Sequence, residues 1–229
     1  MIGIIVAAGK AKRMGNKCKA LIRVKGKPII EYIIQNMIPI VKKIIIIQHG
    51  NEIEKAIGND YLNIPLIYVQ QKRRKGIAHA IYQCKRVKED MLIILGDIIY
   101  FGDLTDMKKT FEELKLKFLF GTQNIIDKSL LKKSYGITYM EEKRCRVIEK
   151  PTDKDLKNMQ NLLGLGIYMA TPKLFDYIKK TKKNEKTKEI EFTDTINEVP
   201  ANLCGTTDLN SFYININTEQ DLKDCEENL

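Results

Sequence analysis

MIGIIVAAGK, residues 1–10, indicates how the whole chain is built. The run IGIIVA (2–7) offers apolar side chains to both faces of an extended chain, which is typical of a strand in the middle of a parallel sheet. It leads directly into small residues, which allow a backbone to approach a ligand closely. Five cations follow between residues 10 and 19. Such a dense cluster of like charges needs either solvent or an anion beside it.

Further apolar runs alternate with amphipathic segments after this strand. The pattern predicts strands at 43–48, 65–70 and 91–97, and helices at 27–41, 51–59 and 77–87. This βαβαβαβ order implies a parallel sheet with helices on both faces. Ligands of such sheets bind at the carboxyl ends of the strands. The loop after residue 7 and Asp97, at the end of the fourth strand, are therefore expected on the same rim.

The second half is predicted to be less regular. Strands are expected at 117–123, 135–140, 146–151, 162–170 and 211–216, and helices at 171–181, 192–199 and 218–229. Pro172 is expected in the first turn of one helix, and Thr193 is expected to cap the next. The lysine-rich stretch 179–189 is predicted to be an exposed loop. No linker or internal repeat is visible, so we expect a single α/β domain over residues 1–229.

Composition limits the class of protein. A chain of 229 residues with 44% hydrophobic and 30% charged residues can bury a proper core. No apolar run reaches 18 residues, and the start reads as a strand, not a signal peptide. The five cysteines are scattered without a Cys-x-x-Cys pair, which predicts reduced thiols and a cytoplasmic protein.

A net charge of +10 is compatible with nucleic acid, an anionic membrane surface or phosphorylated small molecules as partners. Interleaved aromatic stacking platforms are absent, which argues against binding to single strands. We expect no nucleic-acid and no membrane partner. A homo-oligomer is left open.

Two features point to phosphate chemistry. In AAGKAKRMG (7–15), backbone amides after a strand could cradle phosphates while the cations supply counter-charge. Its spacing fits neither a Walker A loop nor a G-x-G-x-x-G fingerprint, and a basic surface loop is the alternative. Asp97 is a natural ligand for magnesium, which binds few carboxylates together with phosphate oxygens, although it could equally be a helix cap.

Taken with other motifs, these features resemble the sugar-1-phosphate nucleotidyltransferases of the glucose-1-phosphate thymidylyl/uridylyltransferase type. The matching segments, in order, are GKAKRM (9–14), CKALIRVKGKP (18–28), Gln71 with GIAHA (76–80), Gly96-Asp97, Tyr135-Gly136, Glu149-Lys150-Pro151, Gly166-Ile167-Tyr168, EFTDTINEV (191–199) and NINTEQDL (215–222). The resemblance implies a Rossmann-like, mainly parallel mixed sheet flanked by helices, the nucleotide-diphospho-sugar transferase type. It also implies a nucleotide-binding half to about residue 123 and a sugar-phosphate-binding half over about 124–229.

The resemblance further implies a reaction. A sugar-1-phosphate oxygen would attack the α-phosphorus of UTP or dTTP in line and release pyrophosphate, so positioning and charge neutralisation would dominate. The implied catalytic residues are Arg13 for the departing pyrophosphate, Lys19 for the α- and β-phosphates, and Asp97. Mg²⁺ would be held by Asp97 and Asn215. No general base is needed, because a phosphate monoester is already ionised.

Binding residues follow from the same resemblance. The nucleotide contacts implied are Ala7, Ala8, Gly9, Lys10, Ala11, Lys12, Arg13, Lys19, Gln71, Gly76 and Ile77, with Gln71 reading the pyrimidine edge and Gly76 leaving room for the base. The sugar-phosphate contacts implied are Gly136, Glu149, Lys150 and Gly166. For the glycines, a role in turns or packing is the alternative. His49 and His79 are expected to be a loop residue and a helix residue.

Departures from the family pattern leave alternatives open. Asn215 and Asn217 replace aspartates, and Cys18 replaces the proline before the signature lysine. An amide oxygen binds magnesium more weakly than a carboxylate, which keeps a non-catalytic nucleotide-binding regulatory subunit in view. The loop from Met14 to Lys19 is short, as in cytidylyltransferases of alcohol phosphates such as inositol or choline phosphate. KRRK (72–75) is expected to be a solvated loop that could attract nucleotide phosphates.

Overall fold

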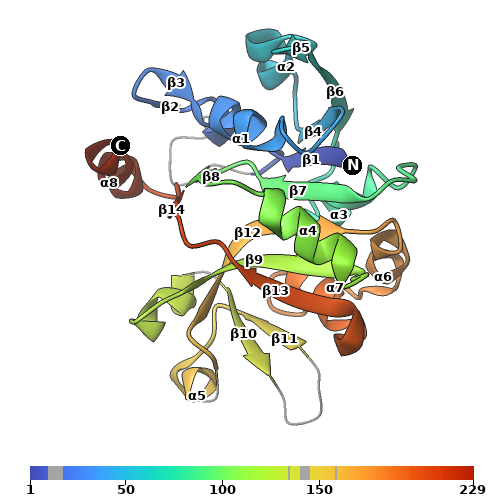
Figure 1. The fold of residues 1–229 in the computed structure, drawn as a ribbon, viewed down its shortest axis with the longest axis vertical. Helices are drawn as coiled ribbons and strands as arrows, with labels where there is room; N and C mark the ends of the chain where they lie inside the picture. Colours follow the sequence, from blue (N-terminus) through green and yellow to red (C-terminus); the bar gives the residue numbers. More distant parts are fainter. Residues whose placement is uncertain (10–17, 134, 140–144, 158) are drawn as a thin grey trace.

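A mixed β-sheet between two layers of helices forms the body of the molecule (Figure 1). The structure is a computed structural model, and it describes residues 1–9, 18–133, 135–139, 145–157 and 159–229. The sheet order is β11-β10-β12-β7-β1-β4-β6-β5, and β9 joins it by pairing with β12 and β13. Its strands are β1 (Ile2–Val6), β4 (Ile44–Gln48), β5 (Asp60–Tyr61), β6 (Ile64–Gln70), β7 (Met91–Leu95), β9 (Phe118–Asn124), β10 (Tyr135–Tyr139), β11 (Cys145–Glu149), β12 (Leu162–Ala170) and β13 (Cys204–Asp208).

Helices and two small sheets complete the described chain. The helices are α1 (Ile29–Met37), α2 (Glu52–Ile57), α3 (Ile77–Tyr82), α4 (Thr105–Glu113), α5 (Asp153–Leu156), α6 (Leu174–Lys180), α7 (Phe192–Asn197) and α8 (Glu219–Asn228). The 3₁₀-helices are η2 (Lys19–Leu21), η3 (Lys128–Lys133) and η4 (Ala201–Leu203). Two small sheets pair β2 (Arg23–Val24) with β3 (Lys27–Pro28), and β8 (Ile98–Phe101) with β14 (Phe212–Asn215). None of the described helices is long and apolar enough to span a membrane.

The centre of the sheet is parallel because its strands are apolar on both faces. β1 pairs in parallel with β4 and β7, and β4 pairs in parallel with β6. Along β1, Ile2 and Ile4 enter the core on one face, whereas Ile5 enters the core on the other. A strand buried on both sides needs a helical layer against each face, and this is what the alternating isoleucines specify.

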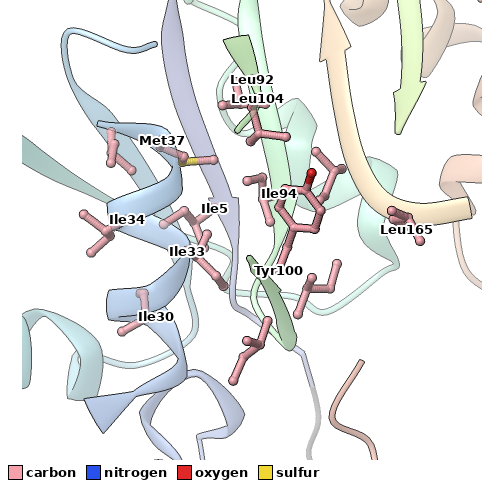
Figure 2. Close-up of a cluster of buried hydrophobic side chains, with 14 of the residues drawn as sticks. Ile5, Ile30, Ile33, Ile34, Met37, Leu92, Ile94, Tyr100, Leu104 and Leu165 are labelled. Carbon is pink, nitrogen blue, oxygen red and sulfur yellow. The ribbon is translucent and has the colours of Figure 1, made fainter. Parts of the chain in front are cut away.

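Two hydrophobic cores result. The first lies under α1 and α4, where Ile33 and Met37 point from α1 toward Ile5 of β1 (Figure 2). The second lies under α3, α6 and α7, and includes Phe118, Phe120 and Phe192 in edge-on ring contacts. Burying one such large apolar side chain stabilises the fold by about 1.5–3 kcal/mol.

The second half continues the same sheet. β12 runs antiparallel to β7, with Ile167 opposite Ile94, so β9 to β13 extend the parallel centre, and only β14 of the described later strands pairs outside this sheet. This agrees with the predicted fold class, a mixed sheet with parallel central strands and flanking helices.

Most predicted elements are confirmed to within a few residues, but some expectations were wrong. The cap of α7 is Glu191, not Thr193, which lies inside the helix with a buried Oγ1 that has no hydrogen-bond partner in the described part of the chain. α6 begins at Leu174, so Pro172 lies in the turn before it. β8, β13 and α4 were not predicted. The stretch after α6 is mostly exposed as expected, although Glu189 and Ile190 turn inward.

Candidate active site

The carboxyl ends of β1, β6 and β7 and the turn η2 enclose a cavity of about 420 Å³. The loop after β1 and Asp97 do meet on one rim, as the strand order predicted. The predicted residues that line the cavity are Ala7, Ala8, Gly9, Lys19, Gln71, Gly76, Ile77 and Asp97. Lys10, Ala11, Lys12 and Arg13 lie outside the described residues, so their predicted roles stay predictions.

Lys19 joins the two halves of the chain at one end of this cavity. Its Nζ donates to Asp97 Oδ2 at 3.0 Å and to Asn217 Oδ1 at 2.7 Å. The side chains of Lys19 and Asp97 keep 20% and 26% of their exposure, so solvent and small anions can still reach the pair. One ammonium thus bridges a carboxylate from the middle of the chain and an amide oxygen near its C-terminus.

Asn217 is the residue that sequence reasoning passed over in favour of Asn215. β14 ends at Asn215, and the chain then turns into α8. The backbone N–H of Asn217 donates to Asp221 Oδ2 at 2.8 Å. This bond lies beside the capping box that Thr218 and Asp221 form at the start of α8. This cap fixes the turn that directs the Asn217 side chain to Lys19. The available signal was the S/T-x-x-D spacing of TEQD (218–221), which marks a helix start.

Asn215 lies deeper. It pairs with Ile98 across β14 and β8, its side chain hydrogen-bonds to Tyr213, and its Oδ1 is buried without a partner among the described residues. An unpaired buried acceptor costs free energy, so this oxygen is suited to a donor or a cation brought by a ligand. Its assignment as a metal ligand stays a prediction.

The donor set suits a cation that arrives with phosphate. Within the described residues, no group of three histidine, cysteine or acidic side chains could hold a metal unaided. Asp97 and Asn217 supply hard oxygen atoms within hydrogen-bond distance of one point, the Lys19 ammonium. Magnesium favours one or two carboxylates with phosphate and water oxygens, and these residues fit that requirement.

The other end of the cavity is built around Gln71, which is only 3% exposed. Its Nε2 donates to Gly76 O at 3.1 Å. Gly76 itself has φ +103°, and a Cβ there would lie 2.5 Å from the carbonyl oxygen of Ile190. Glycine is therefore required by the close approach of the Ile190 backbone, which is a different reason from the predicted room for a base.

Arg74 differs from the rest of the basic loop. Lys72, Arg73 and Lys75 are exposed, as predicted, whereas Arg74 is half-buried and lines the cavity. Its Nε is buried and has no hydrogen-bond partner among the described residues. A guanidinium with an unused donor in a cavity is suited to an anionic ligand.

The predicted sugar-phosphate residues lie in the second half and do not line this cavity. Gly136 pairs with Leu163 and Ile148 in the sheet. Gly166 is buried at φ +72°, where a Cβ would lie 2.5 Å from Ile98 Cδ1, so packing accounts for this glycine. Whether Gly136 or Gly166 also contacts a sugar stays a prediction.

Glu149 and Lys150 end β11 in an acidic setting. Glu149 is exposed at the surface, but desolvation by nearby protein atoms raises its pKa to about 7. The charge of Lys150 opposes this shift, and the charges of Glu191 and Asp194 add to it. Lys150 is exposed with φ +46°, a left-handed conformation that costs about 1 kcal/mol in a non-glycine residue. Strain of this kind is often kept where a side chain must be aimed.

Comparison with known proteins agrees with this geometry. A family model described as Nucleotidyl transferase matches residues 2–208. The UTP–glucose-1-phosphate uridylyltransferase AglF of Haloferax volcanii is 28% identical over 190 residues, which are 76% of this chain and 74% of that protein. The bifunctional protein GlmU of Methanocaldococcus jannaschii is 30% identical over 203 residues, 86% of this chain but 46% of its own length. The chain thus spans about half the length of its GlmU relatives.

Solved structures show the same fold. A UDP-glucose pyrophosphorylase complexed with UDP-glucose superposes with a TM-score of 0.83 at 18% identity, covering 99% of this chain and 97% of the other. At that identity the likeness concerns the fold alone. The family model, which covers nearly the whole chain, carries the assignment: the chain belongs to the nucleotidyl transferase family.

Proposed function

We propose that the chain joins a sugar-1-phosphate, of the glucose-1-phosphate kind, to UTP or dTTP and releases pyrophosphate. The observation that carries this proposal is the cavity lined by Lys19 and Asp97 at one end and by Gln71 at the other, with Asn217 bonded to Lys19. The first end offers charge for phosphates, and the second offers a buried amide for a base. The similarity to AglF, a UTP–glucose-1-phosphate uridylyltransferase, supports the same substrates.

The chemistry asked of the protein is charge neutralisation. An oxygen of the sugar phosphate forms a bond to the α-phosphorus, and the bond to the β-phosphate oxygen breaks with its electron pair leaving on pyrophosphate. Lys19 would bind the α- and β-phosphates, and Arg74 would use its free Nε–H on the same anion. Arg13, outside the described residues, is proposed to act on the departing pyrophosphate. Lys150 would receive the sugar phosphate.

Lys19 has two competing partners in this scheme. Its ammonium contacts both Asp97 and Asn217, so a cation that takes these two oxygens must displace it. A triphosphate supplies the displaced ammonium with a new partner. The residues thus favour metal and nucleotide entering together.

The family generally uses a divalent metal, and we propose Mg²⁺, held by Asp97 and Asn217 with Asn215 as a further oxygen. When bound, it would neutralise phosphate charge and align the reacting oxygens.

The two substrates are assigned to different parts of the chain. We propose a single domain in which residues up to about 123 bind the nucleotide and residues 124–229 bind the sugar phosphate. A cytoplasmic setting is supported by Cys18, Cys84 and Cys225, which form no disulfide in the described part of the chain.

A second substrate class is favoured by an acidic setting around Lys150: the negative charges of Glu191 and Asp194 act on Glu149, as does the positive charge of Lys150. Lys150 could bind a phosphate while these acids face a cationic substituent. Choline phosphate, the substrate of a cytidylyltransferase, has this charge pattern.

The decisive experiment measures pyrophosphate release with Mg²⁺ across UTP, dTTP, CTP and ATP, each with glucose-1-phosphate, an amino-sugar-1-phosphate, inositol phosphate and choline phosphate. Release with UTP or dTTP and a sugar phosphate supports the main proposal, and release with CTP and choline phosphate supports the second. Nucleotide binding without release from any pair would indicate a non-catalytic regulatory subunit instead.

A further inference from the structure

Both histidines of the chain bind the same glutamine. His49 Nδ1 lies 3.0 Å from the Gln71 carbonyl oxygen, and His79 Nδ1 lies 3.0 Å from Gln71 Nε2. A carbonyl oxygen only accepts, so His49 must donate from Nδ1. An amide nitrogen only donates, so His79 must accept at Nδ1. This requires His79 to be a neutral imidazole with its proton on Nε2.

The backbone N–H of Gln71 and the second proton of its side-chain amide are also hydrogen-bonded. Its backbone amide donates to Gln48 O at 2.8 Å, which continues the pairing of β6 with β4 by one residue. The second proton of Nε2 goes to Gly76 O at 3.1 Å. Both amide protons are therefore used, and Oε1, which accepts no hydrogen bond from the described residues, is left for a ligand in the cavity.

A flipped amide would be unfavourable with the same neighbours. Oε1 would then face the Gly76 carbonyl oxygen, acceptor against acceptor, and His79 would have to move its proton to Nδ1 to keep a hydrogen bond to Gln71. Nε2 would turn to the cavity, and the side chain would offer a donor instead of an acceptor. The hydrogen-bonding character of this wall of the cavity thus depends on two groups, the Gly76 carbonyl and the imidazole of His79.

We propose that His79 is a positioning residue for base recognition: it holds Gln71 with Oε1 toward the base and so favours uracil or thymine over cytosine. Uracil and thymine carry a ring N3–H that can donate to Oε1, whereas N3 of cytosine is an acceptor and would be repelled. This inference rests on the proposed function and deepens it, because it names the residue that sets the base preference.

The surroundings of His79 keep it neutral. Burial, with the positive charge of Lys75 as the second cause, lowers the pKa of His79. Apart from His79, α3 carries one titratable side chain, Tyr82, and β1, which packs against α3, has none. The other helices against α3 are α6 and α7, whose titratable residues are Asp176, Tyr177, Lys179, Lys180 and Asp194. Among the described groups, Lys75 is the charge that acts on His79.

Protonation should therefore affect the two histidines differently. His49 keeps its Nδ1–H when it gains a proton, so its bond to Gln71 survives. His79 loses its acceptor, and its new Nδ1–H faces the Nε2 protons of Gln71. Acid should thus reduce the preference for uracil through His79 alone.

The test is equilibrium binding of UTP and of CTP, measured by calorimetry without sugar phosphate. The ratio of their dissociation constants is the readout, because triphosphate ionisation is common to both nucleotides and cancels. At about pH 8 the wild type should prefer UTP. His79→Leu should reduce that preference about 3- to 10-fold, the effect of losing one orienting hydrogen bond. His79→Asn, whose Oδ1 can accept in place of Nδ1, should retain it, and His49→Ala is the matched control that should leave it unchanged.

Acid supplies a second readout that a purely structural role for His79 would not give. As the pH is lowered progressively below 6.5, the ordinary pKa of histidine, the preference should fall in the wild type once His79 gains its proton and stay constant in His79→Asn. An unchanged ratio in His79→Leu would overturn the proposal, as would a ratio that shifts equally with pH in both proteins.

The ¹⁵N shifts of His79 separate this inference from the proposed function. They should show the Nε2–H tautomer at neutral pH, and an Nδ1–H tautomer would refute the positioning role whatever nucleotide binds. If the wild type bound neither UTP nor CTP while the Nε2–H tautomer was present, the proposed function would fail and the base-recognition role with it, but the His79–Gln71 bond would stand.

Discussion

Comparing alanine substitutions at Gly76 and Gly58 measures how much stability is lost when a Cβ is added against the cavity wall. Gly76 has φ +103° and ψ 171°, and Gly58 has φ +83° and ψ −167°, so both occupy the same extended, positive-φ region of the backbone map. That region is essentially restricted to glycine, and an alanine there is strained by about 1–3 kcal/mol. The gain from restricting the unfolded chain is also the same for both substitutions.

The two sites differ in what a Cβ would meet. At Gly58 nothing lies within 4 Å, whereas at Gly76 the Ile190 carbonyl oxygen, amide nitrogen and carbonyl carbon lie at 2.5, 2.9 and 3.0 Å. These are backbone atoms, and Ile190 N is itself bonded to Lys75 O at 2.8 Å. Overpacking costs about 1–3 kcal/mol and a lost backbone hydrogen bond about 1 kcal/mol. Gly76→Ala should therefore lower the free energy of unfolding by about 2–4 kcal/mol more than Gly58→Ala.

Guanidinium denaturation of the two variants gives this difference in unfolding free energy, provided that this free energy depends on denaturant concentration with the same slope in both. Calorimetric binding of UTP to both variants then separates the two roles of Gly76. If Gly76→Ala and Gly58→Ala lose equal stability, the Ile190 backbone does not constrain this position and the packing argument is refuted. If Gly76→Ala is as stable as Gly58→Ala but binds UTP more weakly, the original prediction that Gly76 leaves room for the base is supported.

Three further outcomes follow from the same geometry. Asp97→Asn should reduce metal-dependent pyrophosphate release about 100-fold or more while calorimetry still detects UTP; retained turnover would remove Asp97 from the metal site. Lys19→Met frees the oxygens of Asp97 and Asn217, so Mn²⁺ binding without nucleotide, followed by electron paramagnetic resonance, should tighten, and unchanged affinity would contradict the proposed exchange. Glu149 binds its proton more tightly when folded, with a pKa raised from 4.5 to about 7 mainly by desolvation, so the free energy of unfolding should fall as pH rises through that range. Glu149→Gln should flatten this slope, and a slope identical to that of the wild type would exclude the shift.

The fold could be predicted where local pattern and burial agree. β1, β4 and β7 carry apolar side chains toward both cores, and that pattern is visible without knowing any partner. β13 has the sequence CGTTD, which lacks such a pattern and becomes a strand because β9 is available beside it. β8 is four residues long, and its partner β14 lies more than 100 residues further along the chain, so its pairing is equally hidden from local sequence.

The candidate site divides in the same way. The loop after β1 and Asp97 could be placed on one rim from strand order alone, whereas the family resemblance pointed to Lys19. The choice between Asn215 and Asn217 depends on where β14 ends and α8 begins, a matter of one turn of chain. Arg74 looked like its basic neighbours, and only the folded loop turns its Nε inward. Of two neighbouring arginines, Arg73 is exposed and Arg74 lines the cavity, and neither composition nor spacing distinguishes them.

Asn217 also determines how charge is shared at the phosphate end of the cavity. Where the family motif has an aspartate, a neutral amide oxygen contacts Lys19, so Asp97 is the one carboxylate among the described residues that compensates this ammonium. The ammonium is therefore better able to attract phosphate, whereas a cation finds one negative charge fewer. Asn217→Asp should tighten Mn²⁺ binding and weaken UTP binding measured without metal, because the added carboxylate competes for Lys19. If the variant bound UTP more tightly in the absence of metal, Lys19 could not be the group through which the two ligands are coupled.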